Sequence, residues 1–357
     1  MVDSSFDRRS LPSLKAILRG IQLFVAFTTI GIIVAALWKS PVDPRALIKY
    51  IDPRFVALII PLVAVDYLLG GYRYRLFFDG RVLPKISFLN CIRSNWANIF
   101  LGVITPFQTG GGPAQIYLLW RHGAKISQAM LVGLINLAAT LLFFLVASFA
   151  VIVVLPAGLF NKLMPLIHAA FITVGSVLSL VLLSLVFPNL VIAATRRIFA
   201  VVPARLKRLH NLKNRIINKL DSEIHQFQGD FALILRRQKA RLAIDVIATL
   251  ALFFNKYLIG YVIALSLHQS VPFRTFIGLQ ILQLFLIYFA PTPGASGVAE
   301  LSSTWLLGGL LARDTLVFFA VTWRFFTTML GAMLGGYVLI RDLKRWEKET
   351  SHPPPPG

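Results

Sequence analysis

The sequence predicts an all-α polytopic membrane protein with about six full spans and two re-entrant hairpins made of broken helices. The chain of 357 residues is 57% hydrophobic and 14% charged, and its mean hydropathy is +0.72. Soluble domains are about 25% charged. The net charge of +21, from 36 Lys and Arg against 15 Asp and Glu, would suggest a nucleic-acid partner in a soluble protein. The basic loops of a multi-pass membrane protein account for both values, so we expect no nucleic acid as a partner.

The predicted spans are apolar runs that reach or approach the length needed to cross a bilayer, which is about 20 residues in a helix. The first run is long and is followed by Lys39 instead of a small-residue cleavage site, so it is predicted to be a retained span and not a signal peptide. The runs are Gly20–Trp38, Phe55–Tyr72, Ala129–Leu155, Pro165–Phe187, Leu242–Leu267 and Thr315–Ile340.

Two further apolar regions, Ile86–Leu119 and Thr275–Leu311, are interrupted by the strings TPFQTGGGPAQIY and APTPGASGVAE. Proline and clustered glycine break helices. Irregular backbone is tolerated at membrane depth only inside protein or beside a water-filled cavity. Each region therefore predicts a re-entrant hairpin.

The two interrupted regions also match each other at a constant offset, 291 − 106 = 185 residues. Such a match predicts an inverted repeat with elements near 86–155 and 275–340, a pattern typical of secondary transporters. The alternative is a chance match between two Gly- and Pro-rich loops. The matched pairs are Pro106 and Pro291, Gly112 and Gly297, Gln115 and Glu300, Trp120 and Trp305, and Gly123 and Gly308.

The distribution of Lys and Arg predicts the orientation, because basic loops stay in the cytoplasm. The most basic loop is 189–241, which places both termini of the protein on the cytoplasmic side of the cell (inner) membrane. Residues 1–343 are predicted to form a single integral membrane domain, and 344–357 a disordered tail. Within the loop, apolar residues every three or four positions predict an amphipathic helix over 196–241 that lies against anionic lipid headgroups. A nucleic-acid arm is the weaker alternative, because the apolar stripe needs a partner.

Charged residues lie deep within the spans or hairpins at Asp66, Lys256, Glu300 and Arg324. A charge at the centre of a span costs about 2.5–3.5 kcal/mol on insertion scales, so each needs a partner or a cavity. Glu300 and Arg324 are expected to pair. Lys256 pairs either with Asp66 or with a substrate phosphate. Asp245, near the end of its span, is expected at the membrane interface, and for every one of these charges a purely structural ion pair is the alternative.

The Gly-rich turns predict a midplane substrate site. Free N–H groups at a helix start bind phosphate or carboxylate, and glycine permits close approach of a headgroup. The alternative is a packed structural kink. A single cysteine and the lack of an HExxH motif give no reason to expect a metal, a cofactor or a catalytic residue. The predicted substrate-binding residues are Gly110, Gly111, Gly112, Gln115, Lys256, Gly294, Gly297, Glu300 and Arg324.

Three strings resemble those of one known family: ITPFQTGGGPAQIYLLWRHG at Ile104–Gly123, PTPGASGVAE at Pro291–Glu300 and TWRFFTTMLG at Thr322–Gly331. In this combination and order they are similar to the flippase-like transmembrane region of lysylphosphatidylglycerol synthases, over roughly Leu14–Leu343. The residues Ala295 and Ser296 stand where many relatives have two glycines. In bifunctional relatives this region moves an aminoacylated phospholipid between leaflets. A separate soluble domain makes that lipid, and a chain ending at Gly357 is expected to lack it.

The resemblance implies a lipid transporter or flippase that carries a phospholipid or a lipid-linked headgroup. Two alternatives remain from the residues alone. One is an integral-membrane enzyme that modifies lipid headgroups, which would need a nucleophile or a metal set. The other is a non-transporting partner of an envelope lipid or polysaccharide assembly, for which the intramembrane charges would be dispensable.

Overall fold

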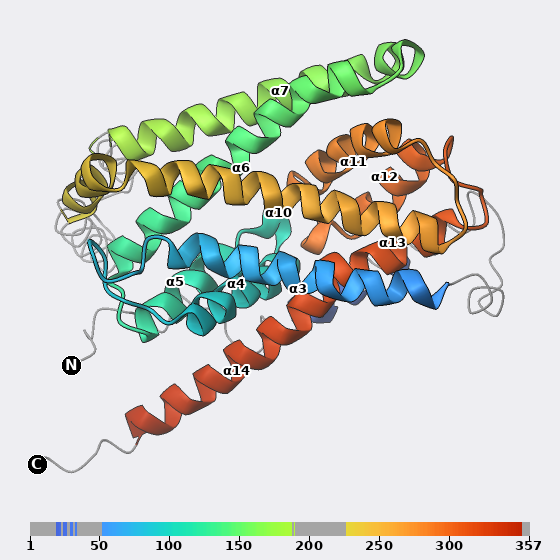
Figure 1. Ribbon diagram of the computed structural model, residues 1–357. Coiled ribbons are helices and arrows are strands. Elements are labelled where there is room, and N and C mark those ends of the chain that lie inside the picture. Colours follow the sequence, from blue (N-terminus) through green and yellow to red (C-terminus); the bar gives the residue numbers. More distant parts are fainter. Residues whose placement is uncertain are drawn as a thin grey trace, which may run out of the picture.

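The computed structural model describes residues 19–22, 24–26, 29–30, 33, 52–187, 189 and 226–351, and every element in these residues is a helix (Figure 1). The all-α fold is therefore confirmed. The elements are α3 (Pro53–Arg75), α4 (Phe88–Val103), η2 (Pro106–Gln108), α5 (Gly111–Arg121), α6 (Ile126–Val154), α7 (Ala157–Val186), α10 (Lys239–Ser266), α11 (Phe273–Tyr288), η3 (Pro293–Ala295), α12 (Val298–Leu307), α13 (Leu316–Arg324), η4 (Phe325–Met329) and α14 (Leu330–Ser351).

Within the described residues, five helical stretches are long and apolar enough to cross a membrane: α3, α6, α7, α10 and the continuous run Leu316–Glu347. Each contains or overlaps one of the predicted spans, and large apolar side chains such as Val153, Ile172 and Leu180 are exposed on α6 and α7. Exposed apolar surface of this kind suits contact with lipid. The predicted first span, Gly20–Trp38, falls largely outside the described residues.

The predicted start of the fourth span is wrong. Helix α7 begins at Ala157, directly after Pro156, and Pro165 lies inside it. Proline favours the position that precedes or opens a helix, because its fixed φ suits the first turn and its missing N–H is not needed there. Pro156 makes this turn, so α6 and α7 are joined by only a short connection.

Two hairpins enter the bundle from opposite ends. Helices α4 and α5 lie in the left half of Figure 1, and α11 and α12 lie in the right half. In each hairpin a long helix and a shorter one are joined by a one-turn helix, η2 or η3, and these two turns pack against each other. The backbone turns sharply there, with positive φ at Phe107, Gln108, Gly294 and Ala295.

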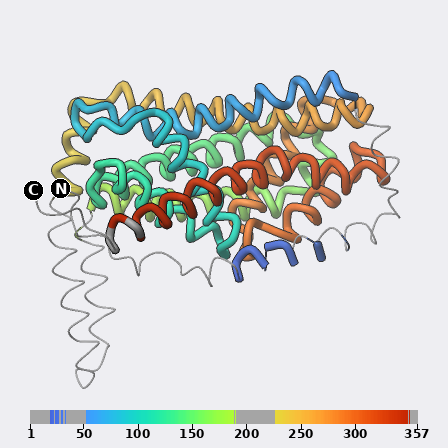
Figure 2. The backbone as a smooth tube through the Cα atoms, turned by 90° about the horizontal axis from the view of Figure 1, so that it is seen from below, coloured from blue at the N-terminus to red at the C-terminus, as the bar shows by residue number. Residues whose placement is uncertain are grey.

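The other helices enclose these turns. Helices α3 and α10 run beside each other along the top of Figure 2, and α4 packs between α3 and α14. Helix α6 packs against α5, α10 and α11, whereas α7 packs mainly on α6 at the periphery. The two turns also contact α4, and η3 contacts α11, so both turns lie inside the bundle.

The last helix extends further than predicted. Helix α14 continues to Ser351, so the predicted disordered tail is wrong for residues 344–351, and 352–357 lie outside the described residues. Arg121 of α5 holds the extension by ion pairs with Asp342 and Glu349, at 3.4 and 2.9 Å. These contacts between distant parts of the chain are not visible in a local sequence pattern.

The predicted amphipathic helix over 196–241 is described only in its second part. Residues 226–237 are helical, the helix breaks at Gln238, and α10 begins at Lys239. Residues 196–225 lie outside the described residues. Arg241, near the start of α10, forms an ion pair with Asp79 and donates to the carbonyl of Leu76, which ties α10 to the loop after α3.

Candidate functional site

A cavity of about 630 Å³ lies at the centre of the molecule, where the two turns meet α3, α6 and α10. Its size is that of an ordinary small-molecule site. Among the predicted site residues, five line it: Gly112, Gln115, Lys256, Gly294 and Arg324. Gly110, Gly111, Gly297 and Glu300 are not among its lining residues.

Lys256 and Asp66 form an ion pair in the wall of the cavity. The Nζ of Lys256 lies 2.8 Å from Oδ1 and 2.9 Å from Oδ2 of Asp66. Of the two partners left open by the sequence, a substrate phosphate or Asp66, the structure therefore shows Asp66. Both side chains line the cavity, so a ligand in it can reach either charge.

The expected pair of Glu300 and Arg324 is also present, with 2.5 Å between Oε1 and the guanidinium. Arg324 donates a second hydrogen bond to the carbonyl of Gly294, at 2.6 Å. The other oxygen of Glu300 accepts from the N–H of Gly297, at 2.7 Å. Glu300 therefore caps the start of α12 with its own carboxylate, and Arg324 fastens the η3 turn to α13.

Gly294 occupies a position that only glycine fits well. Its φ is +58°, and an added Cβ would lie 2.9 Å from the carbonyl oxygen of Val103 and 2.8 Å from the ring of Phe24. The guanidinium of Arg324 lies 5.7 Å from the centre of the same ring. A residue of the predicted first span thus contacts both the η3 turn and the Arg324 side chain.

The Gly-rich turn before α5 is partly used for packing. The N–H of Gly110 donates to Thr105 Oγ1 at 2.8 Å, and a Cβ on Gly111 would lie 2.7 Å from Asn98 Oδ1. Gly112 differs, because nothing lies within 4 Å of the corresponding position and it faces the cavity. The three glycines thus serve different roles: Gly110 and Gly111 close the turn, and Gly112 leaves space in the wall.

Gln115 is held firmly in the cavity wall. Its Oε1 accepts from the hydroxyl of Tyr74 at 2.8 Å and from Nδ2 of Asn98 at 2.7 Å, and its backbone carbonyl accepts from Ser94 at 3.1 Å. Gln115 is 3% exposed. The two hydrogen bonds to Oε1 fix the orientation of the side-chain amide, and the bond from Ser94 holds the backbone.

A third buried pair was not predicted. Arg73 lines the cavity, and its Nε donates to Oδ1 of Asp245 at 3.0 Å. Asp245 is 1% exposed, so it is buried between the helices, whereas its expected depth at the membrane interface stays a prediction. A signal in the sequence was the spacing of Asp66 and Arg73, which are seven residues apart and share one face of α3, although the predicted span ended at Tyr72.

The cavity also has an apolar rim. Phe107, Met130 and Leu137 line it while remaining 59%, 44% and 38% exposed. Leu134 and Leu141 of α6 and Leu284 and Ile287 of α11 continue the apolar wall. One part of the cavity is thus charged and hydrogen-bonding, and another part is apolar and open at its edge.

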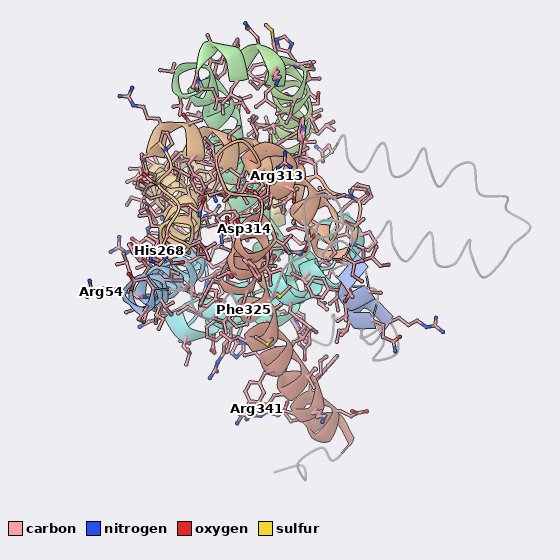
Figure 3. The ribbon with its side chains drawn as sticks, turned by 90° about the vertical axis from the view of Figure 1, so that its right-hand side faces the viewer. Arg54, His268, Arg313, Asp314, Phe325 and Arg341 are labelled. Carbon is pink, nitrogen blue, oxygen red and sulfur yellow. The ribbon has the colours of Figure 1, made fainter. Side chains whose placement is uncertain are left out.

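The two ends of the bundle carry exposed polar residues. Arg54, His268, Arg313 and Asp314 are exposed at one end, which faces the viewer in Figure 3. The loop 76–87 and the carboxyl end of α14 lie at the other end (Figure 1). In the described part of the chain, no group of three or more His, Cys, Asp and Glu side chains is placed to hold a metal ion.

Comparison with known proteins agrees with the three sequence strings. Residues 21–335 match the family described as the lysylphosphatidylglycerol synthase TM region. A protein of Archaeoglobus fulgidus called a UPF0104 membrane protein is 23% identical over 264 residues, which cover 72% of this chain and 79% of that protein. The family indicates a lipid-related role in the membrane. The chain therefore belongs to the lysylphosphatidylglycerol synthase transmembrane-region family.

Proposed function

We propose that the protein translocates a phospholipid or a lipid-linked headgroup between the two leaflets of the cell membrane, through the central cavity. The observation that carries the proposal is the amphipathic character of this cavity. A lipid headgroup can contact the ion pairs and Gln115 in the polar part of the cavity. Its acyl chains can contact the exposed side chains of Phe107, Met130 and Leu137 at the rim. A site for a soluble metabolite would not need an exposed apolar rim.

The arrangement of the two hairpins supports the same proposal. If the long helices cross the bilayer, α4–η2–α5 and α11–η3–α12 each enter and return on one side, and they do so from opposite sides. They are then re-entrant elements of an inverted repeat with both turns near the midplane, as in secondary transporters. Each turn borders the cavity, so a small movement of either hairpin changes access from its own side.

In this proposal both termini lie in the cytoplasm and the membrane is the inner one. The basic loop 189–241, together with the basic end of α14, then lies on the side of the anionic leaflet, where positive charge is retained. The end that carries Arg54, His268, Arg313 and Asp314 lies outside.

Reconstitution tests the proposal directly. The purified full chain is placed in liposomes with traces of fluorescent phosphatidylglycerol, phosphatidylethanolamine or lysylphosphatidylglycerol, and a membrane-impermeant quencher reports the leaflet exposed. We expect time-dependent quenching of inner-leaflet lipid for at least one of these lipids. Unchanged leaflet exposure for all of them, from protein that is folded and incorporated, rejects the function.

A paired variant links transport to the cavity. The double substitution Asp66→Asn and Lys256→Gln removes both charges of one pair without leaving either buried alone. We expect a loss of transport of about tenfold or more, because a headgroup loses its charged contacts. The control is Glu349→Gln, which removes an exposed carboxylate far from the cavity wall and leaves transport unchanged.

A further inference from the structure

Gln115 has a hydrogen-bond donor without a partner. Its Oε1 is used by Tyr74 and Asn98, and in the part of the chain that the structure describes its Nε2 has no acceptor. The side chain is almost fully buried and lines the cavity. Leaving a buried donor unsatisfied costs about 1–3 kcal/mol, so an unpaired donor that is fixed in place indicates a ligand acceptor.

The Nε2 of Gln115 is buried and lies close to a glycine on the facing helix. A Cβ built on Gly133 of α6 would lie 3.0 Å from this nitrogen. Any side chain at position 133 would crowd this nitrogen and any acceptor bound to it. Gly133 lines the same cavity.

The charges around the cavity favour an anion at this place. Arg73, Lys256 and Arg324 line the cavity, whereas Asp66 is the single carboxylate among the lining residues. The carboxylates that neutralise Arg73 and Arg324 belong to Asp245 and Glu300, which lie behind them and outside the lining. The cavity therefore faces the positive ends of these two ion pairs.

We infer that Gln115 Nε2 donates a hydrogen bond to a phosphate oxygen of the translocated headgroup, and that Tyr74 and Asn98 are positioning residues that hold the amide in this orientation. This inference rests on the proposed function, and it identifies the phosphate as the part of the substrate that the site binds. A headgroup ammonium cannot accept this hydrogen bond, since it is itself a donor. A neutral hydroxyl can accept it, but it carries no negative charge to match the basic residues that line the cavity.

A binding measurement tests the inference separately from transport. Thermal unfolding of the full chain in detergent is followed while dihexanoylphosphatidylglycerol is added, since a ligand that binds the native state raises the midpoint. Dihexanoylglycerol, which lacks the phosphate, and inorganic phosphate, which lacks the lipid, are the comparison probes. We expect stabilisation by the phosphatidylglycerol and little by the dihexanoylglycerol. Stabilisation by inorganic phosphate alone assigns the site to a free anion instead of a lipid.

Two substitutions examine the donor. Gln115→Glu keeps the acceptor for Tyr74 and Asn98 but replaces the donor with an oxygen. Gly133→Ala leaves Gln115 intact and crowds its Nε2. Each is expected to weaken phosphatidylglycerol binding roughly 10- to 100-fold. The matched control is Gly175→Ala on α7, where a Cβ meets nothing within 4 Å and binding stays unchanged.

The outcomes separate the inference from the proposed function. If both variants unfold normally and bind phosphatidylglycerol within about twofold of the parent protein, the role of Gln115 is wrong even when transport occurs. If the parent protein binds phosphatidylglycerol through Gln115 but moves no lipid in liposomes, the function is wrong and the binding site stands. Should Gln115→Glu fail to fold, Gly133→Ala decides.

Discussion

Arg73 and Asp245 are joined by a buried ion pair across the contact between α3 and α10, with 3.0 Å between Nε and Oδ1. Arg73 also donates to Thr140 Oγ1 and to the carbonyl of Asn136, both on α6. One guanidinium thus fixes three helices around the cavity. The two residues are 172 positions apart in the chain, so this contact holds together segments from its two halves.

The first prediction concerns this pair. Asp245→Asn leaves Arg73 as an uncompensated buried charge, and we expect a loss of about 3–5 kcal/mol of unfolding free energy. The measurement is denaturant unfolding of the purified protein in detergent. The double substitution Arg73→Met and Asp245→Leu removes both charges and is expected to recover most of the loss. A single variant within about 1 kcal/mol of the parent contradicts the prediction.

The second prediction concerns the crossing of α4 and α14. A Cβ on Gly335 would lie 1.9 Å from the carbonyl oxygen of Trp96, which is backbone and does not rotate away. Gly335→Ala forces the two helices apart and is expected to cost about 1–3 kcal/mol, seen as a lower thermal midpoint. Gly175→Ala gains up to about 1 kcal/mol from helix propensity alone and does not lower the midpoint. If Gly335→Ala and Gly175→Ala have equal thermal midpoints, the close contact between α4 and α14 at Gly335 is wrong.

The third prediction concerns pH. The hydrogen bond from Arg241 lowers the pKa of Asp79, in the loop after α3, from 3.8 to about 2. Because the folded pKa lies below the unfolded value, the pair stabilises the protein fully above about pH 4, and this contribution disappears as the pH falls to about 2. We expect the stability difference between the parent and Asp79→Asn to shrink over this interval. If the difference in unfolding free energy between the parent protein and Asp79→Asn stays constant from pH 6 to about pH 2, the predicted pH dependence is wrong.

The fourth prediction concerns orientation in the membrane. Lys85 and Arg313 are exposed at opposite ends of the bundle. In a Cys91→Ser background, Arg313→Cys is expected to react with a membrane-impermeant maleimide in intact cells, and Lys85→Cys only after permeabilisation. Cys91 is the single cysteine of the chain, so its replacement leaves the introduced thiol as the target of the maleimide. The opposite labelling pattern would place the termini outside.

The sequence predicted the elements that follow from hydropathy and from the cost of charge in a membrane. An apolar span that contains Lys256 or Arg324 needs a counter-charge, and few carboxylates were available to supply it. Both pairs, with Asp66 and with Glu300, are therefore found in the structure. The burial of Asp245 depends on how α3 and α10 pack, and position along a span alone does not reveal it.

The register of the hairpins could not be predicted either. The offset of 185 holds for the long helices, since α4 begins at Phe88 and α11 at Phe273. At the turns the equivalent prolines are Pro106 and Pro293, an offset of 293 − 106 = 187. The connection before η3 is longer, and sequence identity at Pro291 concealed this. Gln115 and Glu300 match in the sequence repeat, but they consequently occupy different positions within their helices.

Because of this difference in register, the matched polar residues of the two hairpins make different contacts. Gln115 is the fifth residue of α5, and its Nε2 has no acceptor among the described residues. Glu300 is the third residue of α12, and its two carboxylate oxygens bind the N–H of Gly297 and the guanidinium of Arg324. In the proposed function, one hairpin supplies a group that recognises the substrate, whereas the carboxylate of the other holds its own turn in place. Combining Gln115→Glu with Glu300→Gln would remove the donor from the first hairpin and the charged cap from the second. Residues that match in the sequence repeat therefore cannot replace each other, because they make different contacts.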